Sequence, residues 1–110
     1  MTAADDRVGA HLDRFNEAVR SGAWGPYLAG LSDSVRMEFV GVPVGPFDGR
    51  AAVAEAYRAN PPDDTLTAVG RISEGPADVV SFAWDRGGEG VLRITWTPDD
   101  RVDRQVIEFT

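Results

Sequence analysis

The period of the hydrophobic pattern changes near residue 60, and this change constrains the fold more than any other feature of the sequence. Before it, apolar residues recur at the three-to-four-residue spacing of amphipathic helices. After it, they alternate with polar residues, which is typical of half-buried strands. Helices followed by a run of strands predict an α+β domain.

Two helices are predicted in the first 31 residues. The apolar stripe of the first helix consists of Val8, Leu12, Phe15 and Val19. Ser21-Gly22 ends this helix, since glycine readily takes the left-handed closing conformation. A shorter helix carries Trp24, Tyr27, Leu28 and Leu31 at the same spacing, with Pro26 in its first turn.

A strand and a third helix follow. Val35–Val40 has strand character, and the glycines and prolines after it predict a loop. Asp48 is positioned as the N-cap of a helix over Arg50–Ala59. The Asn-Pro-Pro sequence at 60–62 ends that helix.

Four further strands are predicted over Thr65–Ser73, Val79–Asp85, Val91–Thr97 and Val102–Phe109. The short, turn-rich sequences between them make neighbouring strands antiparallel. We expect the large side chains Phe82, Trp84 and Trp96 to face the helices. The other face carries smaller side chains, namely Val79, Ser81, Ala83, Val91 and Thr95. Such a flat surface predicts a homodimer through the sheet.

The sequence Gly45-Pro46-Phe47-Asp48-Gly49-Arg50, followed by Ala52, Val53 and Tyr57, resembles the entry to the third helix in the nuclear transport factor 2-like superfamily. The order of elements is similar over nearly the whole chain. This superfamily includes ketosteroid isomerases, SnoaL-like cyclases and non-enzymatic members. The resemblance implies one domain over residues 1–110, a cystatin-like cone with three N-terminal helices on a strongly curved, mixed or antiparallel sheet. It also implies a small hydrophobic ligand in an apolar pocket.

Composition excludes several kinds of chemistry. The chain has no cysteine and one histidine, so we expect no disulfide, thiolate catalysis, metal site or cofactor. A net charge of −7 argues against nucleic acid and anionic lipid as partners. No apolar run is long enough to span a membrane. Residues 1–7 are acidic and lack the pattern of a secretory signal, so we expect a cytoplasmic protein.

The candidate catalytic residues are Glu38 and His11. A ketosteroid isomerase-like site needs a tyrosine, a protonated carboxyl and a carboxylate base. The tyrosine position falls at Phe15 and the carboxyl position falls near Leu92–Arg93, so neither group is present. Only the base has a counterpart, Glu38. Glu38 either faces the pocket, where burial would raise its pKa, or shares the solvent side with Arg36. His11 either serves as a proton shuttle or is solvated on a helix flank. For Arg93 we favour the outer face, because a buried guanidinium needs a compensating charge.

The candidate ligand-binding residues are the aromatic ones, each of which could instead only pack the core: Phe15, Trp24, Tyr27, Phe47, Tyr57, Trp84 and Trp96. Two functions stay open. One is a cofactor-independent isomerase, cyclase or hydrolase that uses acid–base chemistry on an apolar substrate. The other is a non-catalytic, dimeric ligand-binding or interaction domain. The sequence does not identify the ligand.

Overall fold

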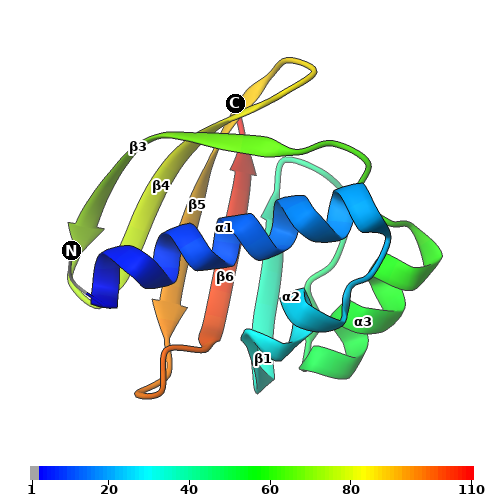
Figure 1. Cartoon of the computed structure of the whole chain (residues 1–110), viewed down its shortest axis with the longest axis horizontal. Coiled ribbons are helices and arrows are strands. Elements are labelled where there is room, and N and C mark those ends of the chain that lie inside the picture. The colour runs from blue at the N-terminus through cyan, green and yellow to red at the C-terminus, as the bar shows by residue number, and fades with distance from the viewer. Residues whose placement is uncertain (1–2) are drawn as a thin grey trace.

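The computed structural model describes residues 3–110, and in this part of the chain three helices pack on one six-stranded sheet (Figure 1). In chain order the elements are α1 (Ala3–Ser21), α2 (Gly25–Ala29), β1 (Leu31–Val40), β2 (Phe47–Asp48), α3 (Arg50–Ala59), β3 (Leu66–Glu74), β4 (Ala77–Trp84), β5 (Glu89–Trp96) and β6 (Val102–Phe109). The predicted α+β class is confirmed. No helix in the described residues has the length and apolar character needed to cross a membrane.

The sheet has the strand order β2-β1-β6-β5-β4-β3. β3 to β6 form the predicted antiparallel meander. β1 lies next to β6 and runs parallel to it. The observed bounds of β3, β4 and β5 differ from the predicted ones by one or two residues, and Leu31 lies in β1 instead of the second helix. Two further details differ from the prediction. β1 begins at Leu31, with an irregularity in its pairing before Arg36. The two-residue strand β2 pairs with β1 and was not predicted, because so short a segment has no measurable period.

The sheet curves around α1, which crosses its concave face (Figure 1). Val8, Leu12 and Phe15 are buried as predicted, and Val19 packs at the edge of the same core. The Phe15 ring lies 6.3 Å from that of Trp84 on β4. The side chain of Asn16 exchanges two 2.9 Å hydrogen bonds with the backbone of Leu66, which fixes the start of β3 against α1.

The prediction that Asp48 caps α3 is wrong. The N-cap is Gly49, whose φ of 93° is accessible to glycine, and no side chain caps this helix end. Asp48 lies in β2 and accepts two hydrogen bonds from Arg36 on the adjacent strand, at 2.7 and 2.9 Å. The backbone N–H of Gly49 donates to the carbonyl of Val35 at 2.7 Å, which sets where α3 begins.

The face of the sheet turned away from the helices, here called the outer face, carries small and charged side chains. Arg93 lies there and forms a 2.7 Å ion pair with Glu74, so its expected outer placement is confirmed. Glu74 and Arg93 are on β3 and β5, which lie on either side of β4. The large side chains Phe82 and Trp84 face the helices, as predicted.

Candidate functional site

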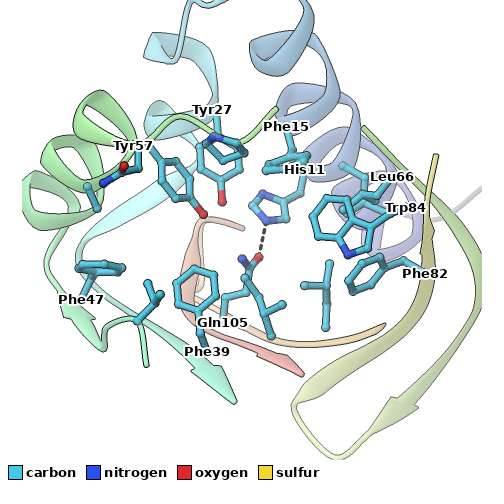
Figure 2. A pocket seen from close by; sticks show the side chains of 17 residues that line it. His11, Phe15, Tyr27, Phe39, Phe47, Tyr57, Leu66, Phe82, Trp84 and Gln105 are labelled. Atoms are coloured by element: carbon cyan, nitrogen blue, oxygen red, sulfur yellow. Dashed lines mark hydrogen bonds between the residues drawn. The ribbon is translucent and has the colours of Figure 1, made fainter. Parts of the chain in front are cut away.

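A cavity of about 450 Å³ lies between the three helices and the concave face of the sheet (Figure 2). Twelve lining residues are apolar: Leu12, Phe15, Phe39, Val44, Phe47, Ala56, Pro62, Leu66, Phe82, Trp84, Leu92 and Ile107. Five are polar: His11, Tyr27, Tyr57, Asn60 and Gln105. Val44 and Asn60 are solvent-exposed, and we call the end of the cavity that they mark the mouth. Cavities that are mostly apolar with a few convergent polar groups are typical of small-molecule sites.

Four of the polar residues meet at the buried end of the cavity. His11 comes from α1, Tyr27 from α2, Tyr57 from α3 and Gln105 from β6. Nε2 of His11 lies 2.7 Å from Oε1 of Gln105, and the His11 ring stacks on that of Tyr27 with centroids 5.3 Å apart (Figure 2). His11, Tyr27 and Gln105 are each at most 3% exposed. Four elements distant in sequence therefore build one polar group, which we call the polar cluster.

His11 is neutral at physiological pH. Burial lowers its pKa to about 4, while the hydrogen bond to Gln105 raises it by a smaller amount. Because the amide oxygen of Gln105 can only accept, Nε2 of His11 carries the proton and donates it. Nδ1 is then an acceptor, and it is buried with no hydrogen-bond partner among the described residues.

The two tyrosines are also neutral and are hydrogen-bond donors. Burial raises the pKa of Tyr27 to about 12, although hydrogen bonds with Gln105 and Tyr57 oppose the increase. Burial raises the pKa of Tyr57 well above its usual value. The Tyr57 hydroxyl donates to Sδ of Met37 at 3.2 Å, and a thioether is a weak acceptor. The polar cluster therefore presents uncharged groups only.

Glu38 does not line this cavity, and its expected raised pKa is not found. The alternation of β1 turns Met37 and Phe39 toward the core and Glu38 toward the outer face. There it accepts hydrogen bonds from Arg36 at 3.0 Å and from Arg104 at 2.7 Å. The Arg36 hydrogen bond is the main reason that the pKa of Glu38 is lowered. A carboxylate held in two ion pairs outside the cavity is not placed to act as its base.

The aromatic candidates divide into two groups. Phe15, Tyr27, Phe47, Tyr57 and Trp84 line the cavity. Trp24 and Trp96 are not among the lining residues, so their predicted role in ligand binding stays a prediction. Trp24 packs behind the cavity against Phe15, Tyr27 and Tyr57, with ring centroids 5.0–5.8 Å away.

Trp96 belongs to a structural cluster at the N-terminal part of α1. The guanidinium of Arg7 lies 4.8 Å from the centre of its ring, and its indole N–H donates to Asp78 at 2.8 Å. Arg7 also pairs with Asp78 and Asp100. These contacts join α1 to the meander. In the described residues, no group of three or more His, Cys, Asp or Glu side chains could hold a metal ion.

Gln105 is the member of the polar cluster that the sequence analysis missed. Its signal was the alternation of β6, in which Gln105 and Ile107 share the buried face. A buried glutamine in a strand needs hydrogen-bond partners from other elements, and here His11 is one of them.

Similarity to proteins of known structure is confined to the fold. No protein-family model and no curated protein sequence matches the chain. SalBIII, described as an epoxide hydrolase/cyclase-like enzyme in salinomycin pyran-ring formation, aligns with a TM-score of 0.73 and 19% identity, over 100% of this chain and 95% of that one. A SnoaL-like protein of unknown function from Burkholderia thailandensis has a TM-score of 0.73 and 18% identity, over 99% and 97% of the two chains.

An NTF2-like protein of unknown function from Cytophaga hutchinsonii has a TM-score of 0.76 and 10% identity, over 100% of this chain and 92% of that one. Another similar structure is described as having a cystatin-like fold. The chain therefore has the nuclear transport factor 2-like, cystatin-like fold, as the sequence resemblance implied.

Proposed function

We propose that the cavity binds a small, mainly apolar and uncharged molecule whose carbonyl or ether oxygen meets the polar cluster. The observation that carries this proposal is the pairing of a cavity of about 450 Å³ with a buried end made only of neutral polar groups. An ionised ligand would lose its hydration there, and no charged side chain is among the described lining residues. Arg14 acts electrostatically on His11 and Tyr27 but does not line the cavity, so it cannot contact a bound ligand directly.

The choice of an acceptor oxygen follows from counting hydrogen bonds. The two tyrosine hydroxyls supply one proton each, and the amide nitrogen of Gln105 supplies two. On the acceptor side, the oxygen of Gln105 already receives the His11 proton, and the Met37 sulfur is weak. Hydrogen bonds of Tyr27 with Gln105 and with Tyr57 use part of this supply of protons. A ligand oxygen at this position would accept one of the protons that these internal hydrogen bonds leave over.

Three bicyclic probes of similar shape test the proposal. We expect 2-decalone to raise the melting temperature of the protein in a saturable way, decalin to bind about threefold to tenfold more weakly, and decalin-2-carboxylate not to bind. Tyr27→Phe removes a donor while keeping the ring, so it should reduce the preference for the ketone over the hydrocarbon. Equal binding of ketone and hydrocarbon, or tighter binding of the carboxylate, would contradict the proposal.

A second candidate function is cofactor-independent acid–base catalysis in the same cavity. The observation that favours it is the buried Nδ1 of neutral His11, which has no hydrogen-bond partner among residues 3–110. In this scheme Nδ1 takes a proton from the carbon next to a bound carbonyl, the electron pair moves to the carbonyl oxygen, and a tyrosine hydroxyl donates to that oxygen. Deuterium incorporation into 2-decalone in D₂O, followed by NMR, measures this step, and His11→Gln should abolish it. If 2-decalone binds but takes up no deuterium, catalysis of this kind is excluded and ligand binding without catalysis is the function of the cavity.

We also propose that two copies pack through the outer face. Its charges are largely paired within each copy, as Arg93 with Glu74 and as Glu38 with Arg36 and Arg104. A face with balanced charge suits self-association in a chain of net charge −7. Sedimentation at micromolar concentration should give a dimer, and Ser81→Arg on β4, within this face, should convert it to a monomer. Ala51→Arg, on the exposed side of α3, is the control. A monomeric mass for the unmodified protein would exclude this dimer.

A further inference from the structure

The exposed large apolar side chains of the described chain gather at one end of the molecule. There are six such side chains, and four belong to the last part of β1, the following loop and the end of β6: Val40, Val42, Val44 and Phe109. β1 and β6 run parallel with Val40 beside Glu108, so the two strands end together. The other two, Val69 and Ile72, lie on β3.

This apolar surface is continuous with the cavity. Val44 lines the cavity and is nevertheless 47% exposed, so its side chain spans the boundary between cavity and solvent. The Phe109 ring stacks on that of Trp84, with centroids 6.5 Å apart, and Trp84 lines the cavity. We call the surface formed by Val42, Val44 and Phe109 the apolar rim.

The backbone around the two rim valines is conformationally restricted. Gly41 and Gly45 flank the segment with φ values of 93° and 73°, a left-handed region that favours glycine. Pro43 between the two valines restricts the chain further. Apolar side chains kept in water carry a free-energy cost that a ligand would relieve by covering them.

We propose that the ligand is longer than the cavity. It is an uncharged amphiphile whose acceptor oxygen meets the polar cluster and whose apolar chain leaves through the mouth and lies on the apolar rim. This inference rests on the proposed function, because it uses the same cavity and the same buried end. In addition, the part of the ligand that lies outside the cavity contributes to its affinity.

A homologous series of 2-alkanones, from 2-hexanone to 2-tetradecanone, tests this inference through their dissociation constants. We expect affinity to rise about threefold to fourfold per methylene, including the methylenes added after the cavity is full. The double variant Val42→Ser/Phe109→Ser removes rim surface from two residues that do not line the cavity. It should weaken binding of the longest ketones by at least tenfold and leave 2-hexanone unchanged.

The double variant Val69→Ser/Ile72→Ser is the matched control, because it removes apolar side chains of 64% and 63% exposure from β3. It should leave the whole series unchanged. An affinity that stops rising once the cavity is full, or equal losses for short and long ketones in the rim variant, would overturn the inference while leaving the proposed function intact. Failure of even the short ketones to bind would overturn the proposed function itself.

Discussion

Gly90→Ala should destabilise the protein by about 3 kcal/mol, because the buried position at Gly90 has no room for a methyl group. A Cβ built there would lie 2.5 Å from Cζ of Phe82 and 2.7 Å from the carbonyl oxygen of Glu108. Gly90 pairs with Phe82 across β4 and β5, and the ring occupies the space that a side chain would fill. The free energy of unfolding, measured in urea, checks this expectation.

Gly70→Ala is the matched control. Gly70 also lies in a strand, but a Cβ there would have no neighbour within 4 Å and its φ is not left-handed. Its replacement should change the free energy of unfolding by no more than about 0.5 kcal/mol. Because Phe82 lines the cavity, Gly90→Ala should also weaken binding of 2-decalone. Equal stability of the two variants would show that Phe82 and β6 can move apart at little cost.

The fold was predictable because the residues that start and end its main elements lie within or next to those elements in the sequence. The predicted bounds of α3 and β6 coincide with those observed, since Asn-Pro-Pro ends one and turn residues flank the other. β2 was not predictable, because its two residues form a strand only where Phe47 and Asp48 meet Met37 and Arg36. Arg36 also explains the failed cap, since its two hydrogen bonds hold Asp48 away from the helix end.

The site was less predictable, because burial at the cavity depends on contacts between distant elements. His11 was a candidate, but its neutral state depends on a full burial that one helix cannot supply. Glu38 lies in an apolar strand, and that context favoured a buried base. The period-two alternation with Arg36 was the stronger signal, because side chains two apart in a strand share one face.

Lowering the pH from 7 to 4 should reduce the free energy of unfolding, and the contribution of His11 to this loss should be about 3 kcal/mol. The pKa of His11 is about 4 in the folded state, below the 6.5 of an ordinary histidine. Between these values the unfolded state binds a proton that the folded state does not, so stability falls as pH falls. Well above pH 6.5 the ring is neutral in both states, and its titration no longer affects stability.

Unfolding in urea at pH 7 and pH 4, with the unmodified protein and His11→Gln, isolates this contribution. Glu38, Glu55 and Asp99, whose pKa values are lowered by hydrogen bonds, also lose stabilising interactions in acid, but they do so equally in both proteins. The difference in acid loss between the two proteins therefore reports His11. Since this is the only histidine, its ring-proton NMR signal should titrate with a midpoint near 4 in the folded protein. An identical acid loss in both proteins, with a midpoint near 6.5, would mean that the ring is solvated and that the polar cluster is open to water.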